Sequence, residues 1–191
     1  MMEEKTMIKT DMRFDQELIK KFIGKNFKQY KCDPFVYTNS VSQICGIYIA
    51  DEIYALKNIQ QVVDYFGTQD DIAVFSLAMA DESEIISCYE NMDQVITPVK
   101  ELIESVTLIN EHQMITKNGV QEYDVWLTRG IIIKTSSRAY SFAKSTVPFS
   151  EEIEIFKGDD ALSQYEDGSD FLEGWDEGIE PHVEQEIVVL Q

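Results

Sequence analysis

The strongest constraint on how this chain can fold is an alternation of apolar and polar residues on both sides of Asn118-Gly119. Alternate positions before this pair share one face of an extended chain, and they are Val106, Leu108, Asn110, His112 and Met114. An Asn-Gly pair between two such runs is typical of a two-residue hairpin turn, because both central residues need a positive φ. The sequence therefore predicts an antiparallel hairpin, which the following strand-like runs extend into a meander over residues 105–157.

Other segments have the spacing of helices. Between Phe14 and Tyr30, apolar residues recur at i, i+4 and i+7, and five lysines gather within one arc of the predicted helix. A shorter apolar pattern follows Asn58 and ends at Gly67, and Thr97-Pro98 has the form of a helix start. The predicted fold class is therefore α+β: a mainly antiparallel sheet packed with an N-terminal amphipathic helix and one or two short helices.

Length and composition predict one folded domain with an acidic extension. A chain of 191 residues with 44% hydrophobic residues is long enough for a single core. The apolar run over residues 72–79 is typical of a strand buried on both faces, which we expect at the centre of the sheet. We expect residues 1–160 to form the α+β domain and residues 161–191 to form an acidic C-terminal segment with isolated aromatic residues, either docked or flexible.

Charge is distributed in blocks along the chain. The formal net charge is −19, yet residues 1–31 hold eight basic and five acidic side chains. Residues 32–99 hold one lysine and eleven acids, and residues 151–191 hold one lysine and fourteen acids. Because opposite charges attract within a Debye length of about 8 Å, we expect the lysine face of the predicted N-terminal helix to lie near acidic surface of the same chain or of a second copy. The scarcity of basic side chains argues against direct binding to nucleic acid or to an anionic membrane.

The sequence predicts a cytoplasmic protein. Its charged start lacks the apolar stretch of a secretory signal, and no uncharged apolar run approaches the length of a membrane helix. The three cysteines, Cys32, Cys45 and Cys88, are odd in number and widely spaced, as expected for reduced thiols.

Few residues have the spacing of a catalytic centre. The sequence contains no glycine-rich phosphate loop, no Cys-x-x-Cys pair and no Gly-x-Ser-x-Gly motif, and its two histidines, His112 and His182, are far apart. Carboxylates are plentiful, and the clusters that could bind a divalent metal are Asp70/Asp71, Glu151/Glu152/Glu154 and Asp159/Asp160. The sequence favours a protein with no cofactor and no enzymatic activity, and a carboxylate-dependent divalent-metal hydrolase or nuclease is the alternative.

The charge pattern favours a non-enzymatic protein-binding module with a basic partner. Acidic side chains steer association with a basic surface, and embedded aromatic residues can prolong the complex. Trp175 has two interpretations, an anchor into the protein's own body or a hot spot for the partner. The residues expected to bind the partner are Glu151, Glu152, Asp159, Asp160, Asp170, Phe171, Glu173, Trp175, Asp176 and Glu177.

In composition alone, the chain resembles the small acidic inhibitors that phages and plasmids direct against defence enzymes, such as anti-CRISPR and anti-restriction proteins. The resemblance implies a partner that processes nucleic acid, on whose binding surface the acidic side chains take the place of phosphates. A housekeeping interaction module, whose charge serves only solubility, is a further alternative. The sequence leaves the oligomeric state open.

Overall fold

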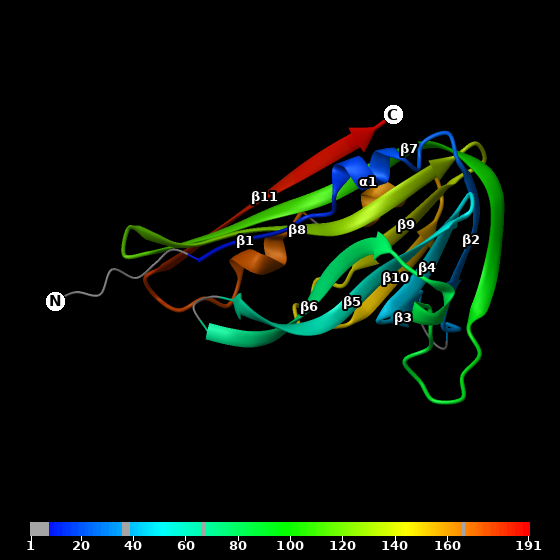
Figure 1. Ribbon diagram of the computed structural model, residues 1–191. Coiled ribbons are helices and arrows are strands. Elements are labelled where there is room, and N and C mark those ends of the chain that lie inside the picture. The colour runs from blue at the N-terminus through cyan, green and yellow to red at the C-terminus, as the bar shows by residue number, and fades with distance from the viewer. Residues whose placement is uncertain (1–7, 36–38, 66–67, 166) are drawn as a thin grey trace.

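The structure is a computed structural model that describes residues 8–35, 39–65, 68–165 and 167–191. Most of the described residues lie in strands, and few lie in helices (Figure 1). The strands are β1 (Ile8–Met12), β2 (Asn26–Cys32), β3 (Ser40–Ser42), β4 (Ile44–Ile49), β5 (Glu52–Tyr65), β6 (Thr68–Met79), β7 (Val95–Lys117), β8 (Val120–Thr135), β9 (Ala139–Lys144), β10 (Glu152–Lys157) and β11 (Ile179–Leu190). The helices are α1 (Gln16–Lys20) and the 3₁₀ turns η1 (Glu82–Glu84), η2 (Ala161–Gln164) and η3 (Ser169–Leu172).

The described strands form one extended sheet. Its order is β3-β10-β9-β8-β7-β2-β4-β5-β6, with β1 beside β8 and β11 beside β7. The strand pairs are antiparallel except for β1 and β8, which run parallel. Figure 1 shows a wide body, from which the β7–β8 hairpin, β1 and β11 extend as a narrower arm.

Strand β7 connects the body to the arm because it changes partners along its length. Residues 95–102 pair with β2, whereas residues 103–117 pair with β8 and residues 106–117 pair with β11 as well. The strand rises along one side of the body and then bends over into the arm (Figure 1). In the described chain, the first part of β7 is paired on one edge only, and an edge of this kind tolerates Pro98.

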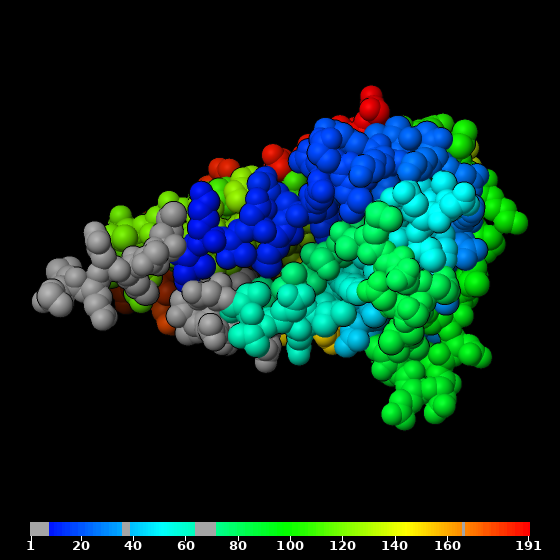
Figure 2. Space-filling view, viewed as in Figure 1, coloured from blue at the N-terminus to red at the C-terminus, as the bar shows by residue number. Residues whose placement is uncertain are grey.

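A curled sheet encloses the main core. The largest buried cluster joins Ile19 and Phe22, from α1 and the turn after it, to Tyr54 of β5 and Phe142 of β9. The rings of Phe22 and Tyr54 meet edge to face, with centroids 4.6 Å apart. Figure 2 shows the N-terminal segment and β4–β6 covering the viewed side of the body. Val41 of β3 and Phe75 of β6 belong to the same cluster, so the two ends of the strand order contribute to one core.

The predicted N-terminal amphipathic helix is wrong. Within residues 14–30, the α-helix covers Gln16–Lys20, and Gly24, with a φ of 74°, lies in the turn into β2. A register shift between Phe27 and Gln29 leaves Phe27 and Tyr30 both buried. The bulged strand thereby reproduces the three-residue spacing of a helix, so the apolar pattern alone does not separate the two structures.

The expected short helices are also wrong, and the α+β class is corrected to a mainly antiparallel β fold. Residues 58–65 continue β5, where hydrogen bonds to β6 and β-branched side chains favour a strand. The last two residues of that helical pattern, 66 and 67, lie outside the described residues. Thr97-Pro98 lies inside β7. Residues 72–79 do belong to a strand, but β6 ends the strand order instead of lying at its centre.

The antiparallel meander expected over residues 105–157 is present in the structure. Strands β7, β8, β9 and β10 are consecutive antiparallel neighbours. Asn118 and Gly119 form the turn between β7 and β8, with φ values of 49° and 78°. These positive angles are the ones that a type I′ turn requires.

A bulge interrupts β8 close to its middle. The ladder with β7 shifts by one residue after Thr128 and resumes at Gly130, which pairs with Ile109. Arg129 is therefore an extra residue with no partner on β7.

The C-terminal segment docks on the sheet beside this bulge. The ring of Tyr165 lies against the backbone of Gly130, where any Cβ would overlap the tyrosine. The Tyr165 hydroxyl lies 2.8 Å from the Ser141 Oγ and also donates to the carbonyl of Phe142 at 3.4 Å. A glycine in β8 is thus needed for the close approach of Tyr165.

Gly130→Ala tests this docking. The added methyl group should displace the Tyr165 ring and lower the free energy of unfolding by about 1–3 kcal/mol, the usual cost of overpacking. Urea denaturation measures the loss, and hydrogen exchange over residues 161–178 measures the loosening of the segment. In a Tyr165→Ala background the same substitution should cost nothing, because a strand favours alanine over glycine. An equal cost in both backgrounds would contradict the contact.

Candidate functional site

The N-terminal lysines neutralise acids from the middle of the chain. Three ion pairs join β2 and the turn before it to the acids at positions 51, 52 and 82. Their Nζ–O distances are 2.7 Å for Lys25–Glu52, 2.9 Å for Lys28–Asp51 and 2.7 Å for Lys31–Glu82. Hydrogen bonds from these lysines hold the pKa of the three carboxyl groups below their usual values. The expected proximity of lysines and acids is confirmed within one chain, although these lysines lie outside any helix.

The C-terminal acids have few such partners. Between residues 159 and 186 of the described chain, one acid forms an ion pair, Glu186 with Arg13 at 3.8 Å, and the carboxylate of Glu184 lies 3.1 Å from the His182 Nε2. The exposed acids of this region are Asp159, Asp160, Asp167, Asp170, Glu173, Asp176, Glu177, Glu180 and Glu184. Negative charge that lysine and arginine do not offset is therefore concentrated on the C-terminal part of the protein.

The residues expected to bind a partner lie on separate elements. Glu151 is engaged within the fold, because its carboxylate accepts a hydrogen bond from Gln43 Nε2 at 2.8 Å. Glu152 is exposed on β10, and the acids at positions 159 and 160 lie between β10 and η2. The remaining six lie within residues 170–177, from η3 to the connection before β11. The structure thus groups these six on one segment and places the other four elsewhere.

Phe171 and Trp175 dock residues 170–177 against the arm. Their rings meet edge to face with centroids 5.5 Å apart, and the Trp175 Nε1 donates to the Phe171 carbonyl at 2.5 Å. Both rings pack on a buried cluster that includes Ile115 of β7 and Tyr123 of β8. Trp175 is therefore an anchor into the protein's own body, and binding of a partner by this segment stays a prediction.

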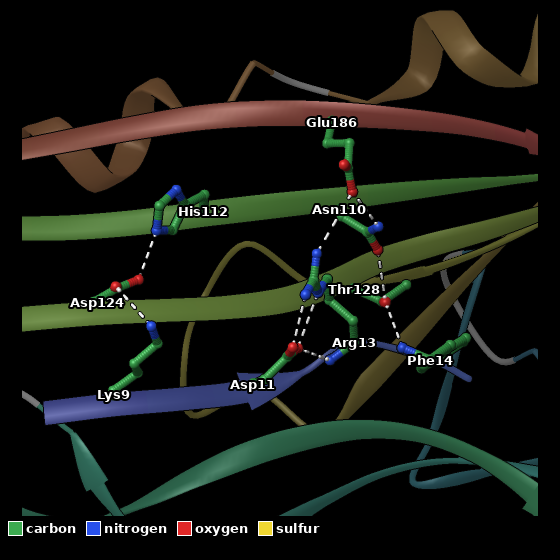
Figure 3. Close-up of polar contacts among 9 residues, drawn as sticks. All are labelled: Lys9, Asp11, Arg13, Phe14, Asn110, His112, Asp124, Thr128 and Glu186. Carbon is green, nitrogen blue, oxygen red and sulfur yellow. Dashed lines mark hydrogen bonds and ion pairs between the residues drawn. The ribbon is translucent and has the colours of Figure 1, made fainter. Parts of the chain in front are cut away.

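The other face of the arm carries a polar network around His112 (Figure 3). The His112 Nε2 lies 2.6 Å from Asp124, whose second oxygen lies 3.9 Å from Lys9. The His112 ring stacks on Trp126 with centroids 4.1 Å apart, and the Arg13 guanidinium lies 4.3 Å from the Trp126 centroid. Because these neighbours approach from opposite sides of β8, both faces of the indole are covered. Trp126 therefore offers no platform on which a base could stack.

The rest of this network joins strands together. Asp11 accepts hydrogen bonds from the Arg13 guanidinium at 2.7 and 2.9 Å, which hold the pKa of its carboxyl below the usual value. Asn110 donates to Glu186 at 2.9 Å and accepts from the Thr128 hydroxyl at 2.8 Å. That hydroxyl also accepts a backbone N–H from the segment before α1. The Thr128 hydroxyl in Figure 3 thus both donates and accepts a hydrogen bond within the fold. The network therefore lacks a free nucleophile for His112 to activate.

A second polar cluster lies where the bulge of β8 approaches the end of β9. The Arg129 Nε lies 3.5 Å from Glu111, and the Arg129 Nη1 donates to the Ser145 carbonyl at 3.3 Å. Gln113 donates to Glu111 at 2.6 Å, and both of these β7 side chains are more than nine-tenths buried. Lys144, the last residue of β9, completes the cluster.

Two polar atoms of this cluster are buried without a hydrogen-bond partner: the Lys144 Nζ and the Gln113 Oε1. Burial, together with repulsion from Arg129, lowers the pKa of Lys144 to about 8. Lys144 and Gln113 line a cavity of about 30 Å³, and Gln113 and Arg129 also line an adjoining cleft of about 250 Å³. The cluster therefore keeps hydrogen-bonding capacity that the protein itself does not use.

Sequence reasoning missed this cluster because its members come from three strands and match no motif. The available signal was on β7, where Glu111 and Gln113 alternate with the same period as Ile109 and Ile115. A carboxylate and an amide on the buried face of a strand need polar partners. Such a pattern indicates a buried polar site but does not identify the residues that complete it.

Comparisons with known proteins do not assign the chain to a family. No family model, no curated protein and no solved structure matches it. Among the described residues, no three His, Cys, Asp or Glu side chains are grouped so that they could hold a metal ion. In the same part of the chain, no helix is both long and apolar enough to cross a membrane.

Lys144→Met should stabilise the protein near neutral pH. A folded-state pKa of about 8, below the ordinary 10.5, means that the protonated lysine costs stability below pH 8. The cost declines as the pH rises from about 8 to 10.5. In this range Lys144 is already neutral in the folded protein but still protonated in the unfolded chain, so folding no longer buries a charge. Methionine keeps the apolar stem without the charge, so the gain should reach at most about 3 kcal/mol at neutral pH and shrink towards pH 10.5.

Chemical denaturation at several pH values measures this gain. The matched control is Lys134→Met, which removes an exposed lysine of β8 and should show no gain that depends on pH in this way. A loss of stability in Lys144→Met at neutral pH would show that Lys144 has a stabilising partner and would contradict the expectation.

Proposed function

We propose that the protein is a non-enzymatic binding module that engages a basic protein through its acidic C-terminal segment. The observation that carries this proposal is the unequal pairing of charges. Acids at positions 51, 52 and 82 are neutralised by lysines of the same chain, whereas most described acids between residues 159 and 186 are exposed and unpaired. A surface with uncompensated negative charge attracts a basic surface over several ångströms.

Docking of the segment supports the same function. Tyr165, Phe171 and Trp175 hold residues 161–165 and 167–175 against the sheet, so the described carboxylates between these anchors are displayed from an ordered backbone. An ordered surface loses less conformational entropy on binding than a flexible tail does. The acids are therefore prearranged for a partner.

Charge and apolar surface have different roles in this proposal. The exposed carboxylates steer the partner and raise the association rate, but a single exposed ion pair contributes only about 0–1 kcal/mol. The lifetime of the complex therefore depends on apolar contacts. Leu172, in η3 of the same segment, is an exposed large hydrophobic side chain that can supply such a contact.

The finer proposal is that the partner processes nucleic acid. Asp170, Glu173, Asp176 and Glu177 place four carboxylates within eight residues. Such a density of negative charge can occupy positions that otherwise bind phosphates, because both are recognised by lysine and arginine. A protein of this kind inhibits its partner by competing with nucleic acid for the same surface.

Two variants with equal charge changes test the proposal. The first neutralises the segment by Asp170→Asn, Glu173→Gln, Asp176→Asn and Glu177→Gln. The control neutralises four acids that are paired with lysines, by Glu17→Gln, Asp51→Asn, Glu82→Gln and Glu84→Gln. Both variants, and the unaltered protein, are used to capture proteins from a lysate of the natural host at about 50 mM and about 300 mM salt.

We expect the unaltered protein and the control to retain the same basic protein at low salt, and the segment variant to lose it. Elution of the captured protein by a double-stranded oligonucleotide supports the finer proposal, whereas elution by salt but not by the oligonucleotide contradicts it. Equal capture by both charge variants would overturn the proposed role of the segment.

A further inference from the structure

The cavity of about 30 Å³ lies where β8 changes its neighbour. Strand β9 pairs with residues 130–134 of β8, and β1 pairs with residues 123–127, so neither strand pairs with the bulge at Arg129. Strand β6 crosses beside this gap, and the Ala73 N–H donates to the Pro148 carbonyl at 2.9 Å. The cavity therefore follows from the bulge and the change of strand, an arrangement that is common beside binding sites.

The polar groups that meet there are incompletely satisfied. Glu111 offsets one of the two positive charges of Arg129 and Lys144, so the cluster has a net charge of +1. The Lys144 Nζ lacks an acceptor and the Gln113 Oε1 lacks a donor. Each buried, unpaired polar group costs about 1–3 kcal/mol, and more when it is charged. The two unpaired atoms therefore point to a ligand that supplies an anionic acceptor and a neutral donor.

The volume of the cavity and the residues that line it restrict the class of ligand further. A cavity of about 30 Å³ has room for about two or three oxygen-sized groups. Ile72, Val74 and Leu127 provide apolar walls on its other sides. In the adjoining cleft, Phe171 provides apolar surface and the carboxylate of Asp170 disfavours a second negative charge on the ligand.

We propose that the cavity and cleft bind a small hydroxycarboxylate, a monocarboxylic acid with a hydroxyl group next to the carboxylate. Its carboxylate lies between Lys144 and Arg129, and its hydroxyl donates to the Gln113 Oε1. Its aliphatic end lies towards the cleft. A ligand with these groups satisfies both unpaired atoms, whereas a simple carboxylate satisfies one of them.

Three compounds of nearly equal shape separate these contributions. The probes are 2-hydroxybutyrate, butyrate, which lacks the hydroxyl, and 2-hydroxybutyramide, which lacks the charge. Titrations followed by ¹H–¹⁵N NMR should show saturable shifts at Gln113, Arg129 and Thr146 with 2-hydroxybutyrate, with a Kd on the order of 1 mM or tighter. Butyrate should bind about tenfold more weakly, and the amide should give no saturable shift at these residues.

Substitutions assign the two contacts. Lys144→Met should lower the affinity for 2-hydroxybutyrate by at least about tenfold. Lys134→Met, outside the cleft, should leave the affinity for 2-hydroxybutyrate unchanged. Gln113→Met should abolish the preference for 2-hydroxybutyrate over butyrate. The unliganded spectra of the variants report whether each one keeps the fold.

Two results would overturn the proposal. The first is the absence of saturable shifts at the cleft residues with 2-hydroxybutyrate. The second is equal affinity for butyrate, phosphate or sulfate at the same residues, which would identify a general anion site without recognition of the hydroxyl.

Discussion

The bulge at Arg129 in β8 is the constraint on which both candidate surfaces depend. The register shift places Gly130, without a side chain, beneath the ring of Tyr165, and this contact docks the acidic segment. The same shift removes Arg129 from the ladder and lets its guanidinium reach Glu111 and the end of β9. A regular ladder at this point would remove the space for Tyr165 and reorient the arginine.

Charge in this protein is balanced locally, and the balance differs between its parts. A net charge of −19 favours expansion of a compact chain through self-repulsion. Lysines on β2 and in the turn before it reduce that repulsion in the body, because they pair with acids around β5 and η1. Along the C-terminal segment the repulsion is opposed by packing, since Tyr165, Phe171 and Trp175 hold it in place. Because packing holds the segment in place, its exposed carboxylates stay at the surface, where a partner can bind them.

The sequence predicted local turns better than it predicted element types. Asn118-Gly119 specifies its turn through backbone angles alone, so no distant contact was needed. The spacing of Phe27 and Tyr30 led to the wrong prediction of a helix. A bulge, which depends on pairing with β4 and β7, gives this strand the apolar spacing of a helix. The buried cluster could not be predicted, because Glu111, Arg129 and Lys144 come together only through the strand order and the bulge.

The central claim, that the acidic segment is a fixed part of the fold, is tested most directly by backbone ¹⁵N relaxation. Order parameters for residues 161–165 and 167–178 should match those of β7 and β8, at about 0.85, because Tyr165, Phe171 and Trp175 anchor the chain. Values below about 0.6 across these residues, with rigid strands beside them, would show a mobile tail and contradict the account.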